Sequence, residues 1–342
     1  MRISAIILFH FLCTSAWTSE PPLNRLGQPF ANANCEIIWA VTNTLPEALW
    51  LYRVQPTTFA PNVISNLIAL GEFTEKDRVA DLGWPLNDPS RMCFSNDKRS
   101  LGIYPHLGFI EYRYPKANDY QTEEGVPTEE ESLRLGIKWA GLLDLDRSQV
   151  SQIGVNTPLH LKFRHDPYRV ITNVNSRSVG FGRRLDGIAF YNKAEGCKIE
   201  FAHHAVVRDI NLSWRNLRRD RLRAVAKPEE LIQWMREGKA FWQWWSPEAQ
   251  AYNSSVFKRV TVKRVTPYYY EEDREKPQEV VYPFAYLETA VDMTITNTIV
   301  PPGEVRFNIP DITNVFKLVV QNITNQTVFM CCPMIDDKGA RK

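Results

Sequence analysis

Proline and glycine recur so frequently in this sequence that long uninterrupted helices are disfavoured over most of it. The 342 residues include 22 Pro and 16 Gly, and both residue types mark turns and the ends of helices or strands. Between these turn residues, short segments alternate apolar and polar side chains, which is the pattern of a half-buried strand. In residues 108–114, for example, Ile110, Tyr112 and Tyr114 share one face. We therefore expect many short strands, with short helices between them.

The overall composition is that of a folded globular protein. Apolar residues make up 44% of the chain and charged residues 23%, which excludes a disordered or collagen-like chain. The 41 basic and 39 acidic residues leave a net charge of +2, so the chain has no charge bias toward nucleic acid or an anionic membrane. A chain of this length commonly divides into two or three units, each with its own core.

The N-terminus has the three parts of a secretory signal peptide. Arg2 precedes an apolar stretch over 3–13 that is interrupted by His10, and mostly small residues follow over 14–19. The stretch is shorter than the ~20 apolar residues of a membrane-spanning helix. A buried N-terminal helix and a lipid anchor at Cys13 are the alternatives. We expect residues 1–18 to be a signal peptide, and the mature chain to be exported to the periplasm or the extracellular space and to contain no transmembrane segment.

Export permits disulfide bonds. The mature chain would keep Cys35, Cys93, Cys197, Cys331 and Cys332. One bridge between Cys35 and Cys93 and another from Cys197 to Cys331 or Cys332 are candidates, although a sequence does not fix disulfide pairing. Buried free thiols are the equal alternative. No pair of cysteines or histidines has the spacing of zinc ligands, so we expect no metal.

Two parts of the chain show the same order of elements, strands followed by the start of a helix. In the first part, strands over 101–104 and 108–114 precede Thr128, whose hydroxyl can cap a helix. In the second part, strands between 159 and 214 precede a helix start at Pro228. This repeated order suggests two modules related by duplication.

The element order predicts an α+β fold in which antiparallel sheets are each packed by a helix. The final third of the sequence is rich in strand patterns and is predicted to be a β-rich C-terminal part. The predicted units are a first α+β module over 35–158, a second α+β module over 159–256 and a C-terminal module over 257–334.

Two segments of the first unit resemble the PepSY-like and cystatin-like modules of secreted bacterial proteins. Residues 101–112 include Leu-Gly-Ile-Tyr-Pro and Gly-Phe-Ile-Glu-Tyr, and residues 126–131 read Val-Pro-Thr-Glu-Glu-Glu. Modules of this kind pack a helix on a curled antiparallel sheet, and they act as inhibitory propeptides or as regulators of a kinase or a protease by contact. The resemblance covers 60–143 and, more faintly, 185–240. It carries over no functional residue, and it implies a non-catalytic binding module.

The sequence contains no catalytic motif. His160 and His165 would point to opposite faces of a strand, and no Gly-x-Ser-x-Gly segment marks a nucleophile. Cys197 with His203, or a pair of carboxylates for glycoside hydrolysis, are the open alternatives. Residues 180–185 lack the third glycine of a dinucleotide-binding loop, and we interpret them as a connection. We therefore expect binding rather than catalysis, and no cofactor.

Five arginines fall within nine residues, namely Arg215, Arg218, Arg219, Arg221 and Arg223. Guanidinium groups bind planar carboxylates and phosphates. Because export argues against nucleic acid, we predict that this stretch docks a protein or an anionic envelope polymer. A solvated turn is the alternative.

An aromatic run follows the predicted third helix and contains Trp242, Trp244 and Trp245. Exposed tryptophan rings anchor protein interfaces and stack on sugars. We predict that these three residues join the arginine stretch in one partner-binding surface, whereas the alternative is that they cap the core.

These features predict an exported, non-enzymatic binding or regulatory protein that acts by contact with an envelope or extracellular partner. The alternative is a carbohydrate-binding or glycan-cleaving protein that uses the tryptophan cluster.

Overall fold

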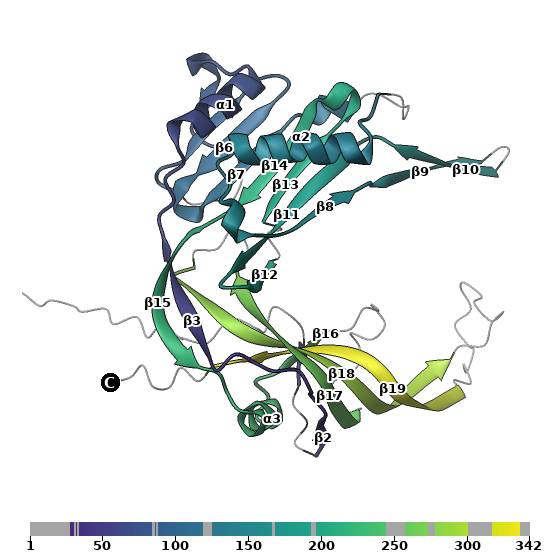
Figure 1. Ribbon diagram of the computed structural model, residues 1–342. Coiled ribbons are helices and arrows are strands. Elements are labelled where there is room, and N and C mark those ends of the chain that lie inside the picture. The colour runs from purple at the N-terminus through teal and green to yellow at the C-terminus, as the bar shows by residue number, and fades with distance from the viewer. Residues whose placement is uncertain are drawn as a thin grey trace, which may run out of the picture.

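The computed structural model describes residues 28–30, 32, 34–83, 86, 88–118, 125–165, 168–192, 196–243, 257–272, 278–299 and 317–335 (Figure 1). Within these residues, strands predominate over three α-helices. The predicted signal peptide over 1–18 lies outside the described residues. A search of the described part of the chain finds no helix that is both long and apolar enough to cross a membrane.

The upper part of the molecule in Figure 1 is an antiparallel sheet with two helices on one face, which we call the helical sheet. Its strands pair in the order β4-β5-β6-β7-β14-β13-β11-β8. Their bounds are Arg78–Val79 (β4), Met92–Ser95 (β5), Ser100–Tyr104 (β6), Phe109–Arg113 (β7), Val207–Ser213 (β14), Cys197–Phe201 (β13), Arg177–Leu185 (β11) and Val150–Asn156 (β8). Short 3-10 segments lie at Glu75–Asp77, Pro105–Leu107, Pro115–Asn118, Arg147–Gln149 and His203–Ala205.

Helices α1 (Pro61–Gly71) and α2 (Glu129–Leu142) begin where the sequence predicts. Proline occupies the first turn of α1, where its missing N–H has no partner to lose. The Thr128 hydroxyl accepts a 3.2 Å hydrogen bond from the Glu131 amide, which caps α2. Gly136 allows α2 to approach the sheet, because a Cβ there would lie 2.7 Å from the side chain of Val179.

The lower part is built on three long strands, which we call the long-strand sheet (Figure 1). These strands are β17 (Phe257–Glu271), β18 (Val280–Ile299) and β19 (Lys317–Pro333). Shorter strands pair around them, namely β1 (Gln28–Pro29), β2 (Glu36–Trp39), β3 (Ala48–Gln55), β12 (Ile188–Asn192), β15 (Asn216–Ala224) and β16 (Phe241–Gln243). Helix α3 (Pro228–Arg236) starts at the predicted proline and buries Leu231 and Met235 in the core of this part.

The predicted α+β class is wrong. Seventeen strands of the described residues form one continuous hydrogen-bonded network, so the fold is β-rich. The network is also mixed, because β12 and β2 both pair in parallel with β17. The prediction failed because it grouped elements by their order along the chain, whereas sheet pairing joins strands that are distant in sequence.

The same pairings join the predicted units to one another. β7, from the first predicted unit, lies directly beside β14, from the second, in a single sheet. Likewise β15 pairs with β3, and β17 pairs with β2. Hydrogen bonds between strands therefore cross both boundaries placed at 158 and at 256.

A two-stranded arm extends from the helical sheet and projects to the right in Figure 1. Strands β9 (Leu159–His165) and β10 (Tyr168–Val174) pair with each other. The arm continues the β8–β11 pair, since β9 follows β8 and β10 precedes β11 along the chain. β8 is therefore the strand of the helical sheet from which the chain enters the arm.

Candidate functional site

β8 forms one edge of the helical sheet. Within the described residues it pairs with β11 alone, so its other side presents backbone N–H and C=O groups that no neighbouring strand satisfies. Its sequence, VSQIGVN, has no charge and no proline. The register shift in this pair lies at its beginning, between Gly182 and Arg183 of β11, so 152–156 pair regularly. β8 thus lacks the charged residues and prolines with which edge strands resist added strands.

An apolar hollow of about 420 Å³ lies on the α2 side of this edge. Its apolar lining consists of Ile137, Ala140, Leu145, Val150, Ile153 and Phe181, and Arg147, Ser151 and Gln152 also contribute to it. Two of these side chains, Ile137 and Ile153, are 41% and 43% exposed, respectively. Two large apolar side chains that are exposed beside a hollow are typical of a surface that binds another molecule.

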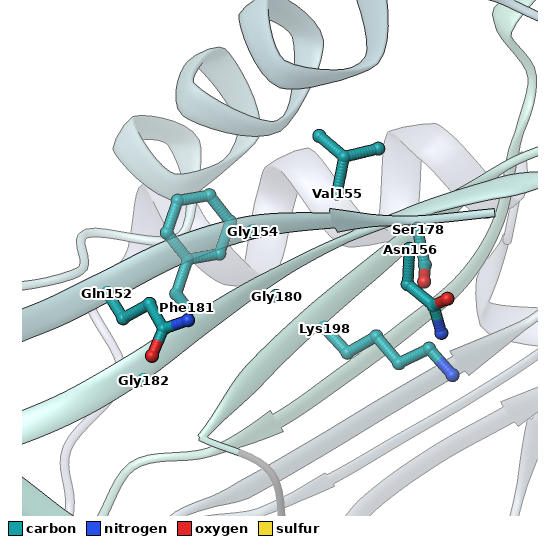
Figure 2. Close-up of a pocket in the computed structure, with 9 residues that line it drawn as sticks. All are labelled: Gln152, Gly154, Val155, Asn156, Ser178, Gly180, Phe181, Gly182 and Lys198. Carbon is teal, nitrogen blue, oxygen red and sulfur yellow. The ribbon is translucent and has the colours of Figure 1, made fainter. Parts of the chain in front are cut away.

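A second hollow of similar volume, about 420 Å³, lies on the opposite face of the same strands, and we call it the polar hollow because Gln152, Asn156, Ser178 and Lys198 line it. Figure 2 shows Gln152, Asn156 and Lys198 projecting to one side of the sheet, while Val155 and Phe181 project to the other. The floor of the hollow is formed by Gly154, Gly180 and Gly182. A Cβ added at Gly154 or at Gly180 would meet no atom within 4 Å, so both positions open onto free space.

Carboxylates and arginines continue this polar face across β13, β14 and β7. Glu200 accepts hydrogen bonds from Ser176 and from Arg208, the latter at 2.6 Å. Glu111 is buried and paired with Arg113.

Asp209 titrates abnormally among these groups. Burial raises the pKa of Asp209 to about 6, and the charges of Glu200 and Glu111 contribute to the increase. Arg113 and, more weakly, Lys198 oppose it. Asp209 therefore stays protonated to a higher pH than an ordinary aspartate.

Arg215 does not lie on a partner-binding surface, which corrects the prediction for this residue. Its side chain is buried, and its Nε atom lies 3.9 Å from Oε1 of the buried Glu271. Its guanidinium also donates to the Leu107 carbonyl at 3.4 Å and to the Gln278 side chain at 2.8 Å. Arg215 therefore joins the helical sheet to the end of β17.

The other four predicted arginines lie on β15. Arg218 and Arg219 are exposed, and Arg221 and Arg223 are half-buried. Arg219 pairs with Asp186 and lies over the ring of Trp50, while Arg221 pairs with its neighbour Asp220. These four residues remain a predicted binding stretch, although two of them have carboxylate partners within the chain.

Trp242 is also buried, so its predicted role in partner binding is corrected. Its ring makes an edge contact with Phe257 at a centroid distance of 5.0 Å, inside the core under α3. Trp244 and Trp245 lie outside the described residues. The structure therefore does not bring the arginine stretch and Trp242 together on one surface.

The five cysteines of the described chain are buried free thiols, as the alternative to the disulfide hypothesis expected. Cys35 and Cys93 belong to separate core clusters. Burial raises the pKa of Cys35 to about 11 and that of Cys331 to about 12, and it also raises the pKa of Cys197. A buried thiol that stays protonated is inert toward disulfide exchange and alkylation.

This burial predicts the outcome of thiol titration. The folded chain prepared without residues 1–18 should react with Ellman's reagent at pH 8 at less than ~0.5 thiol per molecule, because the thiolate is the reactive form. In guanidinium chloride without reductant, all five thiols should react. A smaller number in the unfolded chain would reveal a disulfide and contradict the structure.

The comparisons with known proteins supply no family. No family model matches the chain, and no curated protein matches it. Among solved structures, the chain is similar to an uncharacterized protein from Eubacterium rectale ATCC 33656, with 9% identity, a TM-score of 0.41 and 86% of each chain covered. A likeness at this level carries no argument about function. The resemblance to PepSY-like and cystatin-like modules stays a prediction.

Sequence reasoning missed the β8 site. Residues 180–185, interpreted as a connection, form most of β11, and Gly180 and Gly182 of this strand line the polar hollow. The signal was present as glycines spaced by two at 180 and 182, which place both on one strand face.

Proposed function

We propose that this protein is an exported, non-enzymatic binding protein that acts by contact with an envelope or extracellular protein. The contact is made by an extended segment of the partner, which adds to β8 as a further strand. One observation carries the proposal: the uncharged, exposed edge of β8 lies between an apolar hollow on one face and a polar hollow on the other.

Strand addition makes use of all three features. The partner's backbone would hydrogen-bond to the free edge, which gives affinity irrespective of sequence. Because side chains alternate between the two faces of a strand, successive residues of the partner would enter the apolar and the polar hollow in turn. Amides, a hydroxyl and an ammonium group line the polar hollow, and these groups recognise ligands by hydrogen bonds.

The proposal predicts that a charge placed on the edge blocks binding. Peptides would be selected on the wild-type protein from a displayed random library, and their affinities measured by fluorescence anisotropy. Ile153→Lys should weaken the selected peptides at least about tenfold, because burying a lysine beside an added strand is unfavourable.

Ile38→Lys is the matched control, since Ile38 is also an exposed isoleucine on a strand, at 38%, but lies on β2. It should leave the affinity unchanged, and circular dichroism should show both variants folded. Equal affinities for Ile153→Lys and the wild type would exclude β8 as the site. Selective binding of glycans without any peptide binding would instead favour the carbohydrate-binding alternative.

A further inference from the structure

We infer that the segment added to β8 alternates aliphatic and acidic residues, and that one of its carboxylates pairs with the ammonium group of Lys198 through a water molecule. This inference rests on the proposed strand addition and names the chemistry of the partner. It is carried by a row of three residues that lie side by side on adjacent strands, Gly154, Gly180 and Lys198.

The row forms a trench that crosses the strands. Gly154 on β8 pairs with Gly180 on β11, and Gly180 pairs with Lys198 on β13. Neither glycine has a side chain to fill the space above it, and that space is free of other atoms within 4 Å of a built Cβ. The space above the two glycines is therefore open between the edge of β8 and Lys198.

The distance from the added strand to β13 suits one acidic side chain that pairs with Lys198. Neighbouring strands are about 4.8 Å apart, so a strand added to β8 would lie about 14 Å from β13. Because both side chains leave their strands perpendicular to the sheet, an extended lysine and an extended glutamate span this distance when one water molecule bridges the ammonium group and the carboxylate. A glutamate opposite Gly154 can thus pair with Lys198 through this water, over the two glycines.

Lys198 supplies a positive charge at the closed end of the trench. Within the described residues Lys198 forms no ion pair, although its charge weakly stabilises the Asp209 carboxylate. Glu200, two residues along β13, is already bound by Arg208. Lys198 is therefore a half-buried cation that can still accept a carboxylate.

The other face of the added strand requires apolar side chains. Residues on either side of the acidic one point toward α2, where Ile137, Ile153 and Phe181 line the apolar hollow. Aliphatic, β-branched residues suit both this hollow and the extended backbone. The recognised pattern is thus aliphatic–acidic–aliphatic.

The test uses four peptides of the length of β8, seven residues. The first is Thr-Val-Glu-Val-Glu-Val-Thr, the second and third carry Gln or Lys in place of Glu, and the fourth contains the residues of the first in non-alternating order. The Glu peptide should bind the wild type at least about tenfold more tightly than each of the others. Lys198→Glu should reverse the ranking of the Glu and Lys peptides.

Two further variants keep the result interpretable. Lys258→Glu changes an exposed strand lysine on β17 and should leave the ranking as in the wild type. Gly180→Leu places a side chain in the trench at a position where a Cβ meets no atom within 4 Å, and it should abolish the difference between the Glu and Gln peptides while both still bind.

Each failure has its own signature. If the Glu and Gln peptides bind the wild type equally and Ile153→Lys weakens both, strand addition is supported and the acidic preference is refuted. If neither these four peptides nor any peptide from the random library binds, the proposed function is refuted. If a polyanionic glycan binds through Lys198 but is insensitive to Ile153→Lys, the inference of a peptide partner is overturned.

Discussion

Replacing Arg215 with methionine should lower the free energy of unfolding by about 3–5 kcal/mol, the range found when one partner of a buried ion pair is removed. Arg215 is 1% exposed, and its partner Glu271 is fully buried. Methionine fills much of the same volume but removes the positive charge that lies 3.9 Å from the Glu271 carboxylate. It also removes the donor to the Gln278 side chain, which is 2.8 Å from the guanidinium. The loss should therefore come from the missing charge and hydrogen bond rather than from a cavity.

Urea unfolding followed by circular dichroism measures this loss. Arg218→Met is the matched control, because Arg218 is an exposed arginine three residues further along, and it should change stability by less than about 0.5 kcal/mol. The double variant Arg215→Met/Glu271→Gln should recover part of the loss, since it also removes the buried negative charge that Arg215 stabilised. Equal stabilities for Arg215→Met and Arg218→Met would contradict the buried position of Arg215.

The contrast between these two arginines shows that local sequence patterns do not predict which of them is buried. Both occur in one basic stretch, and composition alone predicts the same solvated or partner-binding role for each. The difference arises because Arg215 follows β14 at the point where the chain leaves the helical sheet, opposite the end of β17. Residues 215 and 271 are brought together only by strand pairings that no local pattern records.

Features that depend on neighbouring residues were predicted correctly. The starts of α1, α2 and α3 follow from a proline or a threonine placed before an apolar stripe, and these signals act within one helical turn. Sheet pairing depends on contacts across the chain, so the β-rich network was missed. For the same reason the site was missed: Gly154, Gly180 and Lys198 lie in one row only after β8, β11 and β13 have paired.

Trp242→Ala is the second substitution with a large expected effect, a loss of about 3–5 kcal/mol in the free energy of unfolding, as for other large aromatic residues removed from a core. Trp242 is 2% exposed and packs against Phe257 in the core that includes Leu231 and Met235 of α3. Its strand, β16, also pairs with β1 and β19. Truncation to alanine would leave a cavity at the point where these elements meet.

Trp242→Phe is the control for Trp242→Ala, because it retains an aromatic ring at the contact with Phe257 and should lose less stability than the alanine variant. Thermal and urea unfolding measure both variants, and peptide binding is measured where each remains folded. The affinity of the peptides that bind at β8 should be unchanged, because Trp242 lies in the core of the long-strand sheet and lines neither hollow. Normal stability with lost peptide binding would instead indicate that Trp242 lies at an exposed interface, and it would contradict the position of Trp242 in the core. Unchanged affinity with reduced stability would separate the residues that hold the fold together from the edge strand that we propose makes contact with the partner.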